Sequence, residues 1–65
     1  MKSEVTFTYK NHKGETSIRL VRPEMIHFGS NEYHPEPQWL MLAWDLHKEA
    51  LRSFAIKDIR DWGPI

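Results

Sequence analysis

Residues 4–23 read EVTFTYKNHKGETSIRLVRP, and this stretch decides the fold class. The apolar positions from Val5 to Tyr9 alternate with polar ones, which is the period of a half-buried β-strand. Residues 11–14, Asn-His-Lys-Gly, predict a hairpin loop because Asn and Gly tolerate positive φ angles. A second alternating strand is expected over residues 16–22. The stretch therefore predicts a β-hairpin at the start of the domain.

The second strand carries apolar residues on one face and a charged residue on the other. Ile18 and Leu20 are expected to face the core, with Arg19 on the opposite side. Pro23 has no backbone N–H to donate to a neighbouring strand, so we expect it to end this strand. Residues 25–28 then predict a third, short strand.

The remainder of the chain continues the β pattern. Residues 39–45, WLMLAWD, are apolar on both faces, so both faces need covering. A proline shortly before them favours a strand over a helix, and residues 50–55 predict another strand. Apolar residues spaced by three within 56–62 predict a single helical or 3₁₀ turn across a barrel end. Five short strands and this turn are typical of a small barrel or sandwich, one all-β domain over residues 1–65.

The expected core draws on each of these strands. The positions assigned to it are Val5, Phe7, Ile18, Leu20, Met41, Ala43, Phe54 and Ile59. Trp39 and Trp44 are better explained as core packing than as platforms for stacking bases, because a domain of 65 residues is short of core. Trp62 is expected either to cover a barrel end or to lie exposed.

Composition restricts the function. Nine basic and nine acidic residues cancel, which argues against binding nucleic acid or a membrane by bulk charge, although a local patch stays possible. No cysteine is present, so disulfides and thiolate metal sites are excluded. No apolar run is long enough to span a bilayer and no signal peptide is visible, so we expect a cytoplasmic protein with no membrane partner.

The polar residues indicate no catalytic centre and no cofactor. The four histidines are scattered without a known metal-ligand spacing, so we expect no metal. No nucleophile motif and no glycine-rich phosphate loop are present, so we expect no enzyme. Carboxylates such as Asp45 and Asp58 are better explained as turn caps or ion-pair partners than as an acid–base pair. Arginines can recognise phosphate or carboxylate bidentately, and Arg19, Arg22, Arg52 and Lys57 are candidates to converge.

The order of the landmarks resembles one known family. A strand containing Tyr9 is followed by the Gly14 turn and then by Arg19-Leu20-Val21-Arg22-Pro23. Later come Trp39-Leu40-Met41-Leu42-Ala43 and a closing Arg52-Ser53-Phe54-Ala55-Ile56-Lys57-Asp58-Ile59. This order is similar to that of the WYL domain, a bacterial module with an SH3/Sm-like β-barrel. Two positions depart from the family pattern: Leu40 replaces the middle tyrosine, and Asp58 replaces a frequent arginine.

The resemblance implies a sensing module in transcriptional or phage-defence regulation. Together with the strand pattern, it gives the expectation of a small five-stranded SH3/Sm-like barrel with a short C-terminal helical turn. It also implies a ligand surface of arginines and a tyrosine, and the residues carried over are Tyr9, Arg19 and Arg52. The helix-turn-helix that often accompanies the domain is not found in this sequence, so a stand-alone domain is expected.

Two functions follow as alternatives. The first is a binding module that takes a small anionic ligand or single-stranded nucleic acid on its arginine surface. The second is a protein–protein interaction or homo-oligomerisation module that uses the apolar 39–44 strand or a sheet edge.

Overall fold

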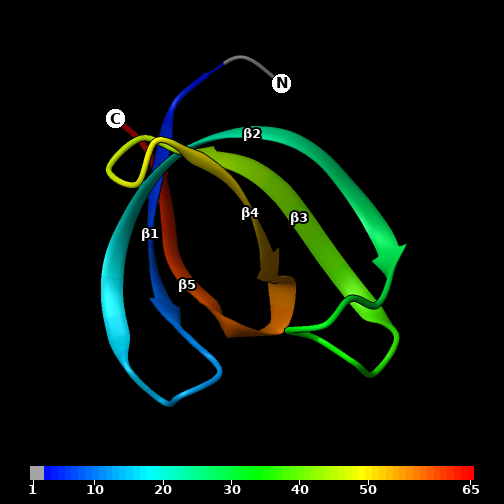
Figure 1. Ribbon diagram of the computed structural model, residues 1–65. Helices are drawn as coiled ribbons and strands as arrows, with labels where there is room; N and C mark the ends of the chain where they lie inside the picture. The colour runs from blue at the N-terminus through cyan, green and yellow to red at the C-terminus, as the bar shows by residue number, and fades with distance from the viewer. Residues whose placement is uncertain (1–2) are drawn as a thin grey trace.

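Five antiparallel strands make up the computed structural model, which describes residues 3–65 (Figure 1). The strands are β1 (Val5–Lys10), β2 (Thr16–Gly29), β3 (Gln38–Asp45), β4 (Ala50–Ala55) and β5 (Ile59–Pro64), with a 3₁₀ turn, η1 (Ile56–Asp58), between the last two. They form one strongly curved sheet in the order β4-β3-β2-β1-β5. The all-β, five-stranded prediction is confirmed. The expected domain also includes Met1 and Lys2, which lie outside the described residues.

The first hairpin forms where the sequence predicted it. The Asn11 side-chain Oδ1 accepts hydrogen bonds from the backbone N–H groups of Lys13 and Glu15, each at 2.9 Å. Gly14 has a φ of 82°, a conformation that residues with a Cβ rarely adopt. This loop pairs Lys10 with Thr16, and that pairing determines which residues oppose each other along the two strands.

The predicted inner face of β2 is wrong. Because the hairpin aligns Val5 with Val21 and Phe7 with Arg19, the inward face of β2 carries Arg19 and Val21. Ile18 lies on the other face with 70% of its surface exposed, and Leu20 is only half-buried. The period-two pattern was correct, but the hairpin register overrides the preference of isoleucine for the core.

Pro23 does not end β2, which corrects the expectation of a separate strand over residues 25–28. The strand continues to Gly29 and changes partner on the way: β1 pairs with it up to Val21, and β3 pairs with it from Val21 onward. The β2–β3 register shifts between Pro23 and Met25, which marks a bulge. Bulges bend a strand and accommodate a proline, so β2 crosses from one half of the sheet to the other (Figure 1).

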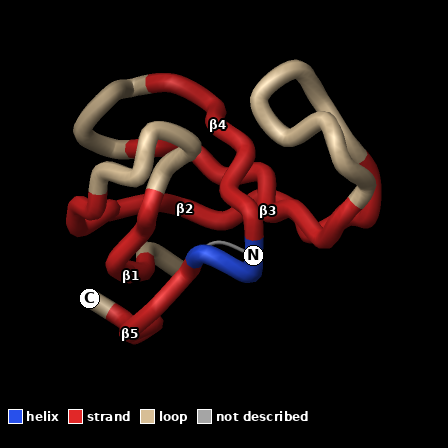
Figure 2. The backbone as a smooth tube through the Cα atoms, turned by 90° about the horizontal axis from the view of Figure 1, so that it is seen from below, coloured by secondary structure: helices blue, strands red, loops and turns tan. Residues whose placement is uncertain are grey.

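The C-terminal segment is more extended than its spacing predicted. The 3₁₀ turn covers only Ile56–Asp58, and Ile59–Pro64 forms β5 along β1 (Figure 2). The expectation of a helical turn through Trp62 is therefore wrong beyond Asp58. The register between β1 and β5 is irregular, and Asp61 adopts a φ of 55°. Pairing with β1 supplies hydrogen bonds that an isolated turn over these residues would lack.

The core lies inside the curve of the sheet. Its buried members are Val5, Phe7, Tyr9, Val21, Met41, Ala43 and Phe54, with Ile56 and Ile59 packed against them. Trp39 is 57% exposed, so its expected place in the core is wrong, whereas Trp44 is half-buried. Trp62 is 49% exposed and stacks on Phe7 with ring centroids 5.7 Å apart, so it covers the core from one side.

Candidate functional site

A cleft of about 380 Å³ opens beside β4. One wall is β4 itself, a second is the end of the β1–β2 hairpin, and the third is the connection between β2 and β3. Tyr9, Arg19 and Arg52, the three residues carried over from the sequence resemblance, all line it. They come from three different strands, so only the folded sheet brings them together.

Arg19 enters the cleft from the inward face of β2. Its side chain is only 14% exposed, and Nη1 lies 3.4 Å from Oδ2 of Asp45. The guanidinium carbon lies 5.8 Å from the ring centroids of both Tyr9 and Phe54, within cation–π range. Its Nε is buried without a hydrogen-bond partner. Arg19 is therefore a largely desolvated cation with donor capacity left unused.

Asp45 is the counter-ion of Arg19, and the sequence did not identify this pairing. The residue is 1% exposed at the end of β3. Its Oδ1 accepts the backbone N–H groups of His47 and Lys48, each at 3.0 Å, which confirms the expected turn cap. Its Oδ2 faces Arg19, 26 residues away in the chain. An acidic residue directly after an apolar strand signals the cap, but no local signal identifies the arginine.

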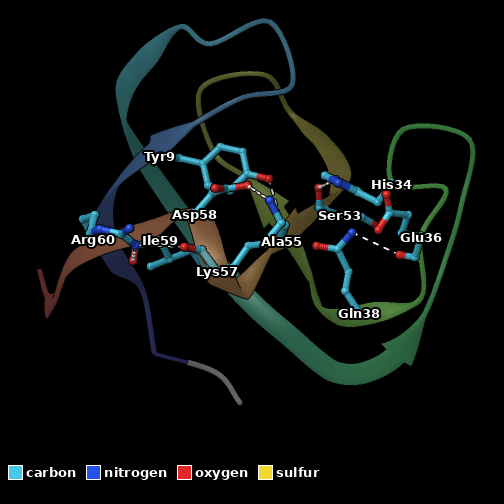
Figure 3. A network of polar contacts seen from close by, with 10 residues as sticks. All are labelled: Tyr9, His34, Glu36, Gln38, Ser53, Ala55, Lys57, Asp58, Ile59 and Arg60. Carbon is cyan, nitrogen blue, oxygen red and sulfur yellow. Dashed lines mark hydrogen bonds and ion pairs between the residues drawn. The ribbon is translucent and has the colours of Figure 1, made fainter.

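Tyr9 is buried at the base of the cleft. Its hydroxyl oxygen accepts the backbone N–H of Ala55 at 2.8 Å, as Figure 3 shows, and this leaves the phenolic proton available for donation. Burial raises the pKa of Tyr9 above its ordinary value of 10.0, and the nearby charge of Asp58 raises it further. The Ala55 N–H and the charges of Arg19 and Lys57 act in the opposite direction. Tyr9 is therefore a neutral donor in this cleft.

The raised pKa of Tyr9 predicts a loss of stability in alkali. In the unfolded chain the phenol ionises near pH 10, whereas in the folded protein it holds its proton to higher pH. The free energy of unfolding should therefore be unaffected by this group below about pH 9 and should fall from about pH 10 until the folded pKa is reached. Urea denaturation across that range measures the effect. Tyr9→Phe should flatten the decline and Tyr33→Phe, at an exposed tyrosine, should not; identical profiles for all three proteins would contradict the assignment.

Arg52 differs from Arg19 in being solvent-exposed. It lies on β4 opposite Ala43, on the same face as Phe54. Within residues 3–65 no acidic side chain forms an ion pair with it. Its guanidinium is therefore accessible from the cleft without first breaking an internal pair.

The third wall is ordered by one asparagine. Asn31 Oδ1 accepts the backbone N–H groups of Tyr33 and His34 at 2.9 and 2.8 Å. His34 Nε2 then lies 3.3 Å from the carbonyl oxygen of Ser53, which ties this segment to β4 (Figure 3). Tyr33 is 62% exposed, and its ring centroid is 6.1 Å from that of His12. The wall therefore adds an accessible aromatic ring to the lining of the cleft.

The cleft continues past this wall. A second hollow of about 260 Å³ shares His12, Tyr33 and His34 with it and extends to Lys57 and Asp58 on η1. The charged residues that line the first cleft are Arg19, Arg52 and Glu32. Asp45 neutralises Arg19, so Arg52 supplies the positive charge that has no ion-pair partner within residues 3–65. Arg22, the fourth basic candidate, pairs with Glu4 at 3.2 Å and does not line either hollow. The structure thus brings together Arg19 and Arg52 and leaves Arg22 outside.

Two further features concern metals and membranes. Over residues 3–65, no group of three or more His, Asp or Glu side chains converges as a metal site would require. In the same part of the chain, no helix is long and apolar enough to cross a membrane.

Comparison with known proteins identifies one family. The family model of the WYL domain matches residues 1–64. No curated protein and no solved structure shows significant similarity to the chain.

Proposed function

This chain belongs to the WYL domain family, and from that membership we propose that it is a non-enzymatic sensing module which binds a phosphate-bearing ligand in the cleft beside β4. The family suggests a ligand- or nucleic-acid-sensing regulatory role. The finer assignment, to phosphate and to these residues, rests on the cleft. A role in transcriptional or phage-defence regulation is part of the same proposal.

One observation carries the proposal: two arginine side chains line one cleft. Arg19 keeps 14% of its side chain exposed, and Arg52 is exposed and forms no ion pair within residues 3–65. Guanidinium groups match the geometry of phosphate oxygens, and hydrogen bonds to a charged acceptor are stronger than neutral ones. An anion in the cleft would accept hydrogen bonds from the exposed Arg52 guanidinium and from the exposed part of Arg19.

The roles of the lining residues follow from their exposure. Arg52 is accessible and is the first contact for an incoming anion. Arg19, held by Asp45, offers its remaining N–H groups at a defined position. The Tyr9 hydroxyl can donate its proton, and the exposed Tyr33 ring can stack on a base or another flat group.

Net neutrality limits the affinity. The nine acidic residues oppose long-range steering of an anion, so binding must come from local contacts. Few phosphates can be engaged at once. We therefore expect a Kd of about 10⁻⁴–10⁻⁶ M for a single-stranded oligonucleotide, in the range of non-specific nucleic-acid complexes. Each phosphate contact should contribute about −0.7 to the slope of log K against log salt.

The test is fluorescence anisotropy of a labelled single-stranded oligonucleotide at several salt concentrations. Arg52→Ala should weaken binding by about 10- to 150-fold, which corresponds to about 1.5–3 kcal/mol for a charge-assisted hydrogen bond. It should also reduce the salt slope by about 0.7. Arg19→Lys, which keeps the charge but loses the planar fork, should weaken binding as well.

Arg22→Ala is the matched control, because it removes the same charge from outside the cleft. It should leave the affinity nearly unchanged. Competition with pyrophosphate and with a mononucleotide distinguishes a small anionic ligand from a nucleic acid strand. Absence of binding at low salt to all three probes, or equal effects of Arg52→Ala and Arg22→Ala, would eliminate the cleft as the site.

A further inference from the structure

The second half of β2 is a sheet edge with no neighbour on one side. β1 pairs with β2 only as far as Val21, and β3 occupies the opposite side from Val21 to Gly29. Within residues 3–65, no strand pairs with the β1 side of Met25–Gly29 (Figure 1). Alternate residues of an antiparallel strand turn their N–H and C=O groups outward, so this edge offers a row of unused hydrogen-bonding groups.

Large apolar side chains lie on both faces of this edge. Ile26 and Phe28 lie on one face, with Trp39 beside Phe28 across the β2–β3 pair. Phe28 and Trp39 are 58% and 57% exposed, and their rings meet edge-to-face with centroids 5.5 Å apart. Met25 is 50% exposed on the other face, which it shares with the half-buried His27. A long exposed apolar edge is a site for pairing with another strand unless charges or kinks block it.

Contacts, charges or backbone irregularities interrupt the other free edges of the sheet. On the outer edge of β4, the Tyr9 hydroxyl occupies the Ala55 N–H and His34 lies against the Ser53 carbonyl. β5 has charged residues, a positive φ at Asp61 and a terminal proline. The first half of β2 is polar at its start, and its Leu20 carbonyl accepts the N–H of Leu46. Central β3 has neighbours on both sides, so the 39–44 strand has no open edge.

We propose that the Met25–Gly29 edge of β2 pairs antiparallel with the same edge of a second copy of this chain. An antiparallel edge is complementary to itself across a two-fold axis, so the same donors and acceptors satisfy each other. Five residues span roughly 17 Å, the length of an ordinary strand. The chain has no net charge, so two copies do not repel each other over distance. Pairing also brings the Ile26 and Phe28 side chains of the two copies together and removes them from water.

This inference is independent of the anion cleft and needs no ligand for its test. Sedimentation equilibrium or light scattering should show a monomer–dimer equilibrium that depends on protein concentration. Ile26→Lys places a charge in the interface and should weaken dimerisation at least about tenfold. Ile18→Lys is the matched control: the same change, at a residue of β2 that is 70% exposed and outside the proposed interface, should leave the dimer intact.

Phe28→Lys provides a second disruption if Ile26→Lys fails to fold, as judged by circular dichroism. Hydrogen exchange at residues 25–29 should slow as the concentration of the wild type rises. A wild-type protein that stays monomeric up to about 1 mM, or a dimer weakened equally by Ile18→Lys and Ile26→Lys, would overturn the inference.

Discussion

Phe54→Ala is expected to lower the free energy of unfolding by about 3–5 kcal/mol, the usual loss for truncating a buried phenylalanine. The Phe54 side chain is 2% exposed, and its ring lies 5.3 Å from that of Phe7 and 4.9 Å from that of Tyr9. Removing it leaves a cavity at the junction of β1 and β4. A domain of 65 residues has a total stability of only about 3–10 kcal/mol, so much of it should be lost.

Urea denaturation measures this loss, and Leu51→Ala on the same strand is the control. Leu51 is 55% exposed, so its truncation should change stability by less than about 1 kcal/mol. A Phe54→Ala protein that unfolds cooperatively at the same urea midpoint as the wild type would contradict the placement of Phe54 in the core.

Asp45→Ala is expected to destabilise the fold by a similar amount, about 3–5 kcal/mol. The substitution removes the carboxylate 3.4 Å from Arg19, which leaves a cation with only 14% of its side chain exposed and no counter-ion. It also leaves the N–H groups of His47 and Lys48 without their acceptor. Breaking a buried pair from one side is costly because the remaining charge stays desolvated.

Two variants separate these contributions. Asp45→Asn retains an oxygen that can cap the turn but loses the charge, so its loss of stability should be smaller than that of Asp45→Ala. Glu4→Ala breaks an ion pair whose two side chains are 43% and 44% exposed, and should change stability by at most about 1 kcal/mol. Thermal or urea unfolding of the three variants measures the loss of stability caused by each substitution. Equal losses of stability for Asp45→Ala and Glu4→Ala would contradict the prediction that the buried Arg19 requires Asp45 as its counter-ion.

The sequence predicted which residues belong to the candidate site but not the contacts that hold them in place. Tyr9, Arg19 and Arg52 were selected from a resemblance, and the fold places them around one cleft. Asp45 was expected to cap a turn, and it does. Its ion pair with Arg19 forms because β2 pairs first with β1 and then with β3, and no local sequence pattern predicts this change of partner. The same is true of Tyr9 and Ala55, which are 46 residues apart.

The sequence by itself determined strands β1, β3 and β4, the first half of β2, the hairpin at residues 11–14 and the family. These follow from period-two alternation and turn chemistry, which are local properties of the chain. The tertiary structure alone decided which face of β2 is buried and that β2 passes through Pro23. Alternation of apolar and polar residues indicates that a strand has two different faces, but it does not indicate which face is buried. The register between paired strands determines the buried face, and the β1–β2 hairpin sets that register here. This register places Arg19 on the inward face and Ile18 on the outward face. The burial of Arg19 is tolerated because Asp45, at the end of β3, supplies a carboxylate beside it.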